Sequence, residues 1–568
     1  MTGWKVLCAG LVFTAVSTVS AAGMATLAGR VDTSGAWVAV LLGTIAAGLT
    51  ARGAMAPKQH LTLADTTLFI IFALVSLRAF LWIIYPQGNE LRVLSPHNLG
   101  DMSLHLNLIQ RWAHGGTFWP SNPFLAGAIF PYHPGMDLWN ALLQVLGLPL
   151  YQGLRWTGLL GAAATAAALW RWGRGFTVAA FLFAGGFGAL TLIQISGPDI
   201  MEAKTAWKNP FLTMLVTQRG LLYSLPAGLV LMTAWRAELG EPRSERQLPI
   251  LAQAALYASM PLFNAPAFIF LSAVLLACAV SDWRHKMSGT FFATGMISAI
   301  PATWLVLMVT AGLTAPSALR FLPGWMQGDD GLGFWLWNFG AFLPLVVVVG
   351  VMVFRRGSGQ PANRVFFSVG LATLLFSFLF ALAPWPWDNT KLILWGYLTI
   401  MPLLWSELIH LWPQWARSVA CLVLFASGGL SLAAGLDQRH GYKLADRAEL
   451  AAVQASLRSM PINQRLAVAP SYEHPALLLG QPVVMGHDGH LFSQGLDYKN
   501  VHRRLDDLMS GRKNWREAAR RLQVHYLFWG QRESEKWPDS PQPWKTSAPA
   551  VAKTSYGTLY LLTPCLLR

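Results

Sequence analysis

Residues 66–113 read TTLFIIFALVSLRAFLWIIYPQGNELRVLSPHNLGDMSLHLNLIQRWA. The first part, Thr66–Tyr85, is almost entirely apolar and has the length that a helix needs to cross the hydrocarbon core of a bilayer. A polar loop follows, and after it comes a segment whose apolar residues recur at helical spacing: Leu104, Leu108, Ile109 and Trp112. The stretch predicts a membrane-spanning helix, an outer loop, and an amphipathic helix on the membrane surface.

The composition of the whole chain agrees with a membrane protein. It has 568 residues, of which 54% are hydrophobic and 12% are charged, whereas soluble domains carry roughly a quarter charged residues. The 26 Trp fit the aromatic belts of membrane interfaces. The net charge of +15 comes from short clusters beside apolar runs and from the C-terminal tail. Because no basic stripe forms on one face, we exclude a nucleic-acid partner.

The apolar runs predict a polytopic α-helical membrane protein with about thirteen spans. The expected spans are Val6–Ala28, Ala36–Ala51, Thr66–Tyr85, Met136–Leu148, Leu154–Trp170, Val178–Ile195, Gly220–Trp235, Leu248–Val280, Thr290–Leu313, Phe339–Phe354, Val365–Leu382, Leu392–Leu411 and Val419–Leu436.

Cations in the short loops predict the orientation, because cytoplasmic loops are enriched in Lys and Arg. The loops that carry Arg52, Lys58, Arg284, Lys286, Arg355, Arg356, Arg364 and Arg417 are placed in the cytoplasm. The long loops 86–135 and 314–338 and the tail from Asp437 then fall outside. We therefore expect a multi-pass protein of the cell (inner or plasma) membrane with an extracytoplasmic C-terminal domain.

Two features strain this topology. Arg171 and Arg174 face outward in it, and Leu248–Val280 has to be one long span kinked at Pro261 and Pro266. If Leu248–Val280 is instead two short helices, the orientation of everything between Met136 and Leu248 is reversed.

The expected organisation has four parts. Residues 1–65 hold two N-terminal helices, 66–313 a core with the first outer loop 86–135, 314–436 the second outer loop and four more helices, and 437–568 a soluble α/β domain. In the tail, extended runs at Arg465–Val468, Pro482–Met485, Val524–Trp529 and Thr558–Leu562 predict strands, and Val501–Gln523 predicts a helix.

The first outer loop carries two carboxylate–imidazole pairs at i, i+4 spacing: Asp101 with His105, and His133 with Asp137. On a helix such pairs share one face. They suit general acid/base work, or they hold a divalent cation, for which these four residues are the candidate ligands. The plainer alternative is that Asp101 caps the N-terminus of the amphipathic helix.

A second polar group lies at the start of a later span, in WPWDNTKLILWGY (385–397). Lys391 could neutralise a phosphate, with Asp388 and Trp387 beside it, or it could simply pair with Asp388 and snorkel to the interface. Trp387 suits either sugar stacking or an aromatic belt. Arg219 becomes a further phosphate candidate if the orientation of its loop is reversed.

The GDMSLH sequence on the first outer loop, the amphipathic helix after it and the YHP entry into the next helix resemble the GT-C superfamily of integral membrane glycosyltransferases. These enzymes depend on polyprenyl-phosphate sugars and include the aminoarabinose and protein mannosyl transferases. The resemblance implies that Asp101 is the catalytic base. Many members carry two neighbouring acids in this loop, whereas Asp101 stands between Gly100 and Met102, which leaves metal dependence open.

The resulting expectation is an enzyme that transfers a sugar from a polyprenyl-phosphate donor to a lipid, glycan or protein acceptor on the outer face. Asp101 and His105 are its catalytic residues; His133, Asp137, Asp388, Lys391, Arg219 and Trp387 bind substrate. No phosphate-cradling glycine loop, nucleophile elbow or zinc motif occurs. Two alternatives remain: a transporter of lipid-linked saccharides, and a non-catalytic envelope protein that binds lipid or glycan.

Overall fold

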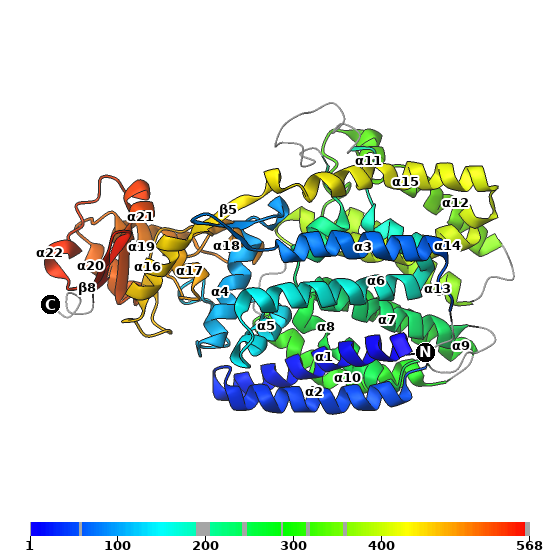
Figure 1. Ribbon diagram of the computed structural model, residues 1–568, viewed down its shortest axis with the longest axis horizontal. Coiled ribbons are helices and arrows are strands. Elements are labelled where there is room, and N and C mark those ends of the chain that lie inside the picture. The colour runs from blue at the N-terminus through cyan, green and yellow to red at the C-terminus, as the bar shows by residue number, and fades with distance from the viewer. Residues whose placement is uncertain are drawn as a thin grey trace.

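The computed structural model describes residues 2–55, 59–188, 205–240, 247–285, 288–313, 319–355 and 361–562. Long helices lie side by side in one bundle, and a smaller α/β domain formed by the tail projects from one end of it (Figure 1). Three cations used above to orient the chain, Lys58, Lys286 and Arg356, lie outside the described residues.

Eight helices in the described part of the chain are long and apolar enough to cross a membrane, and a ninth span is formed if the bent pair α11 (Gly331–Phe339) and α12 (Phe342–Arg355) counts as one. The eight are α1 (Thr2–Ala28), α2 (Thr33–Gly53), α3 (Leu63–Leu81), α9 (Ala265–His285), α10 (Thr290–Val309), α13 (Pro361–Leu379), α14 (Thr390–Glu407) and α15 (Gln414–Gly435). The chain is therefore a polytopic helical membrane protein with a C-terminal α/β domain, as predicted, although the described residues give eight or nine such spans and not about thirteen.

The helix α6 (Leu150–Leu182) contains two antiparallel halves that meet at Gly173 and Arg174, where the backbone leaves helical geometry. The first half runs antiparallel to α3, since Gly158 lies against Phe80. The second half runs parallel to α3, since the backbone N–H of Gly175 donates to Asp65 and Phe181 stacks on Phe72. The two halves correspond to two expected spans, the second of which is described only to residue 188.

The prediction of one long kinked span over Leu248–Val280 is wrong. The segment forms two helices, α8 (Ile250–Phe263) and α9, that fold back on each other at Asn264. The Tyr257 hydroxyl hydrogen-bonds the Ser272 hydroxyl at 2.7 Å, which requires an antiparallel pair. The Asn264 side chain accepts from the N–H of Ala267 and so caps α9.

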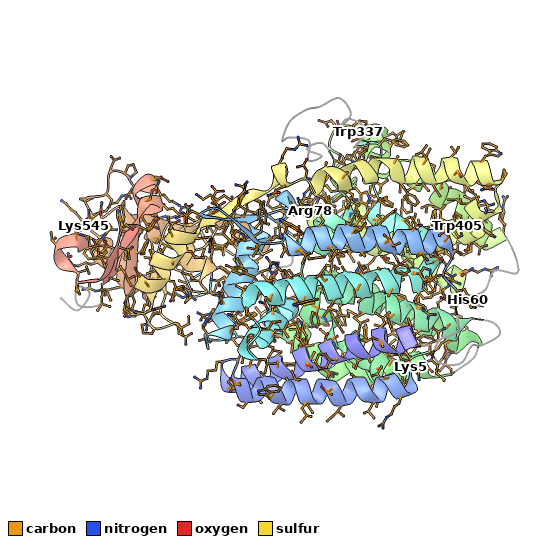
Figure 2. All side chains as sticks on the ribbon, viewed as in Figure 1. Lys5, His60, Arg78, Trp337, Trp405 and Lys545 are labelled. Carbon is orange, nitrogen blue, oxygen red and sulfur yellow. The ribbon has the colours of Figure 1, made fainter. Side chains whose placement is uncertain are left out.

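The prediction of a span over Met136–Leu148 is also wrong. This stretch forms α5 (Gly135–Val145), and 11 residues at about 1.5 Å per residue are too short to cross a bilayer. Two changes to the predicted topology follow: this span is absent, and α8 and α9 count as two helices. The helices between α5 and α8 therefore run in the direction opposite to the predicted one. Arg171 accordingly packs over the ring of Trp4, at the end of the bundle far from the tail. Lys5 and Trp405 lie at that same end (Figure 2).

The amphipathic helix α4 (Asp101–Ala113) does not lie with one side in water. Ten of its residues are buried, because α5 packs on one side and the tail on the other. The Asn107 amide donates to the carbonyls of Leu477 and Gln481 in the tail, and the Arg111 guanidinium donates to the carbonyl of Ile462. The tail therefore covers the side of α4 that α5 does not.

The tail and the first outer loop share a sheet. The hairpin β1 (Tyr85–Gln87) and β2 (Glu90–Val93) pairs through β2 with β5 (Tyr442–Asp446), which follows the last span. Across the bundle, β3 (Arg320–Phe321) of the second outer loop pairs with β4 (Phe380–Ala381).

The rest of the tail is a small α/β unit with the strand order β6-β7-β9-β8. Its strands are β6 (Leu466–Ala467), β7 (Tyr526–Gly530), β8 (Ala550–Thr554) and β9 (Gly557–Leu561), and its longer helices are α16 (Arg447–Leu457), α19 (Lys499–Met509) and α20 (Trp515–Arg521). Three predicted strands are confirmed in position; the run Pro482–Met485 contributes only isolated bridges, from Val483 to Leu466 and from Met485 to Leu125.

Candidate functional site

A cavity of about 490 Å³ lies where the start of α4, the residues before α7 (Leu221–Leu239), the start of α14 and the tail meet. Of these elements, α4 lies at the end of the bundle that carries the tail (Figure 1). The side chains that the sequence marked and that line it are Asp101, His105, His133, Trp387, Asp388 and Lys391. Residues from three distant parts of the sequence thus meet in one hollow.

Asp101 is the first residue of α4, but its side chain does not cap the helix. The N-cap is Gly100, whose φ of +85° suits glycine, and no side-chain capping bond forms there. One carboxylate oxygen of Asp101 instead accepts a hydrogen bond from the Gln218 amide at 3.2 Å. Burial raises the pKa of Asp101; the charges of His105 and Lys391 oppose this rise, and that of Asp388 adds to it. A carboxylate whose pKa is raised in this way suits a general base near neutral pH.

His105 and Asp137 form a buried pair. The Nδ1 atom of His105 lies 2.9 and 3.0 Å from the two oxygens of Asp137, and the side chains are only 6% and 3% exposed. A carboxylate oxygen can only accept, so Nδ1 carries the proton. The Nε2 atom makes no hydrogen bond to the described residues, and His105 lines the cavity. Asp137 itself does not line the cavity formed by the described residues, and it contacts that cavity through His105.

The expected pairing of His133 with Asp137 is wrong, because His133 precedes α5 and does not share a helical face with Asp137. Its ring stacks on Tyr132 with centroids 4.8 Å apart and lines the cavity. Burial, assisted by the charge of Lys391, lowers the pKa of His133 to about 3. This imidazole is therefore neutral at physiological pH, which suits hydrogen bonding to an uncharged group.

Lys391 and Asp388 form an ion pair at 2.8 Å on the bundle wall, with side-chain exposures of 12% and 24%. The pairing is the one that the plainer alternative predicted, yet both groups face the same cavity as Asp101. Trp387 is fixed there by the hydrogen bond from its indole N–H to the Ala206 carbonyl. Trp395, which the sequence placed near them, is fully buried against Phe270 and takes no part.

Arg219 is 1% exposed and does not line the cavity. Its charge interacts with Asp137 and Tyr132, which places it behind the buried His105–Asp137 pair. None of its three guanidinium nitrogens has a hydrogen-bond partner among the described residues. Arg219 is therefore a buried charge near the cavity and not one of its lining residues.

A metal-binding group is not formed within the described ranges: no three His, Cys, Asp or Glu side chains come together there. Of the four candidate ligands, His105 and Asp137 bind each other.

The tail contributes cavity residues that the sequence did not mark. They are Tyr472, His487, Gly489, His490, Ser493 and Gln494. The only sequence signal is HDGH at 487–490, which places two imidazoles three residues apart in a polar loop. His97, from the first outer loop, is a further lining residue that the sequence reasoning missed.

No protein-family model and no curated protein matches the chain. Among solved structures, an oligosaccharyltransferase from Archaeoglobus fulgidus, tethered to an acceptor peptide containing the NVT sequon, overlaps 82% of this chain and 69% of its own, with 12% identity and a TM-score of 0.41. ArnT from Cupriavidus metallidurans in the apo state overlaps 89% of this chain and 99% of its own, with 12% identity and a TM-score of 0.44.

Proposed function

We propose that the chain is a membrane glycosyltransferase of GT-C architecture that transfers a sugar from a polyprenyl-phosphate donor to a lipid, glycan or protein acceptor. One observation carries the proposal. A carboxylate, Asp101, and an ammonium, Lys391, share a cavity at the edge of a membrane-spanning bundle, under a soluble domain. The reaction requires a base for the acceptor hydroxyl and a cation for the departing phosphate, and both are available there.

The donor would enter from the lipid with its prenyl chain in the bilayer. Two apolar side chains at the cavity, Leu99 and Trp385, are about half exposed and offer a surface for that chain. Lys391 would bind the phosphate diester. Asp388 already neutralises part of the charge of Lys391, so the wall suits a singly charged phosphate better than a highly charged one.

In the transfer step, Asp101 would take the proton of the acceptor hydroxyl as the oxygen attacks the anomeric carbon. The new carbon–oxygen bond forms while the bond from the anomeric carbon to the phosphate oxygen breaks on the opposite face. The electron pair leaves with the polyprenyl phosphate, whose charge Lys391 stabilises. Gln218 would hold the Asp101 carboxylate in place, and His105, fixed by Asp137, would offer its free Nε2 to a substrate hydroxyl.

The proposed location is the cell membrane, with the cavity and tail on the extracytoplasmic side. Arg52 and Arg284 lie in the last turns of α2 and α9, and Arg417 lies in the first turn of α15. These helix ends lie at the opposite end of the bundle from the tail (Figure 1), as the positive-inside rule expects of the cytoplasmic side.

The test uses purified full-length protein in lipid nanodiscs, supplied with polyprenyl-phosphate sugars and with a membrane extract as the source of acceptor. Mass spectrometry follows the release of free polyprenyl phosphate. The proposal expects release with the wild-type protein. A donor that stays intact but moves between leaflets would indicate a transporter, and a donor that binds without change would indicate a non-catalytic binding protein.

A further inference from the structure

The two walls of the cavity differ in charge. The bundle wall carries all three charged side chains that line it: Asp101, Asp388 and Lys391. The tail wall is made of Tyr472, His487, Gly489, His490, Ser493 and Gln494, and none of these has a formal charge at neutral pH when its imidazoles are neutral.

The imidazoles of the tail wall are held in that neutral form. Burial, together with the neighbouring His487 and His105, lowers the pKa of His490 to about 4. Burial likewise lowers the pKa of His487, which Asp488 opposes. A neutral imidazole has one N–H donor and one acceptor nitrogen, as a hydroxyl partner requires.

The tail wall also has a fixed shape. Tyr472, His487 and His490 form a row of edge-to-face rings with centroids 5.3 Å apart at each step. The row ends beside Gly100, where a side-chain methyl would lie 3.3 Å from the His490 Nε2 atom. Gly100 immediately precedes Asp101, so the row runs up to the proposed base.

A buried polar atom on this wall lacks a hydrogen-bond partner within the part of the chain that the structure describes. The side-chain oxygen of Gln494 is buried and accepts no hydrogen bond among the described residues, although Gln494 lines the cavity. A buried amide oxygen without a donor is costly, and a ligand hydroxyl would satisfy it.

From this asymmetry we infer that the tail wall is the acceptor subsite and that the acceptor is an uncharged carbohydrate, bound through its hydroxyl groups to Gln494, Ser493 and the two imidazoles. The inference rests on the proposed function and deepens it. A phosphate-bearing acceptor would find no cation on this wall. A polyhydroxyl ring would find neutral donors and acceptors, which reject analogues that lack the hydroxyls.

The test measures binding without any donor. Full-length protein in nanodiscs is probed by saturation-transfer NMR with methyl glycosides of glucose, galactose, mannose and arabinose, with glycerol phosphate, and with a neutral Thr-containing tetrapeptide. We expect at least one glycoside to bind, and binding to be about three- to tenfold weaker in Gln494→Ala. Gln454→Ala is the matched control, because Gln454 is an exposed glutamine of α16.

A second variant, Ser493→Ala, removes a single hydroxyl from the same wall. It gives an independent measurement of glycoside binding if Gln494→Ala fails to fold. Failure of all four glycosides to bind, or equal binding by both wall variants and the control, overturns the inference. Asp101→Asn separates the two proposals, because glycoside binding should survive that change. Binding of the peptide or of glycerol phosphate with no glycoside binding would overturn the carbohydrate subsite and leave the glycosyltransferase proposal intact.

Discussion

The Nδ1 atom of His105 contacts both carboxylate oxygens of Asp137, at 2.9 and 3.0 Å, across 32 residues of sequence. This contact joins α4 to α5 and fixes which imidazole nitrogen faces the cavity. It also brings the buried Arg219 into the same charged layer, since Arg219 interacts with Asp137. The cavity therefore has an inner supporting layer whose loss should be measurable separately from loss of the reacting groups.

Replacing Asp137 by Asn should lower the free energy of unfolding by on the order of 1–3 kcal/mol, because a buried charge-assisted hydrogen bond is lost and the buried Arg219 loses the favourable charge of Asp137. Thermal unfolding in detergent measures the effect. Asp329→Asn, the same change at an exposed position, should stay within about 0.5 kcal/mol of the wild type. Equal stability of the two variants would mean that the buried pair contributes nothing.

Lys391→Met should weaken donor binding about tenfold or more, because one charge-assisted contact to the phosphate is removed. Lys391→Arg should retain part of the affinity, since the charge remains. Donor titration in nanodiscs measures both. Lys443→Met removes a surface lysine that pairs with Asp446 in the tail and should leave donor affinity unchanged. If Lys391→Met bound donor as the wild type does, the phosphate would have to lie elsewhere.

The dependence of kcat on pH should report Asp101. Burial raises its pKa, so the acid limb at saturating donor should lie above the value of about 3.9 of an ordinary Asp, and activity should fall as the pH drops through it. Lys391 lowers this pKa and Asp388 raises it. Lys391→Met should therefore move the limb to higher pH, and Asp388→Asn should move it to lower pH. Shifts in the same direction would contradict the assignment.

Gly480→Ala should loosen the tail from α4. A methyl group at Gly480 would lie 2.5 Å from the Arg111 backbone nitrogen, and its φ is +85°. Crowding of this kind typically costs about 1–3 kcal/mol. Gly127→Ala has the same kind of positive φ but open space around it, so it reports backbone strain alone. Limited proteolysis should cut the Gly480→Ala tail faster than the Gly127→Ala tail, and equal rates would show that the close contact is unimportant.

The membrane class and most tail strands could be predicted because they depend on local runs of apolar or extended residues. Pro261 and Pro266 marked a break in the apolar run 248–280, but proline alone does not distinguish a kink from a reversal. The reversal depends on side chains that meet across the hairpin, such as Tyr257 and Ser272. Likewise, the i, i+4 spacing of His133 and Asp137 places them on one face only if a single helix contains both residues. The helix α5 begins between them.

The candidate site was predicted in part. Asp101, His105, His133, Asp388, Lys391 and Trp387 do meet in one cavity. The tail wall could not be predicted, because His490 lies almost four hundred residues after Asp101 and reaches it only through the packing of the tail on α4. The burial of α4 on both sides could not be predicted either, because it also depends on the packing of the tail. Its polar residues Asn107 and Arg111 donate hydrogen bonds to the tail.

The turnover of Asp101→Asn tests the central claim most directly. The substitution keeps the size of the side chain and its acceptor for Gln218, and it removes the group that takes the proton. With a polyprenyl-phosphate sugar at saturation, kcat should fall by about 10²- to 10⁴-fold, while donor affinity changes little and the control Asp497→Asn, at an exposed tail position, turns over as the wild type. Turnover of Asp101→Asn equal to that of the wild type would contradict the account.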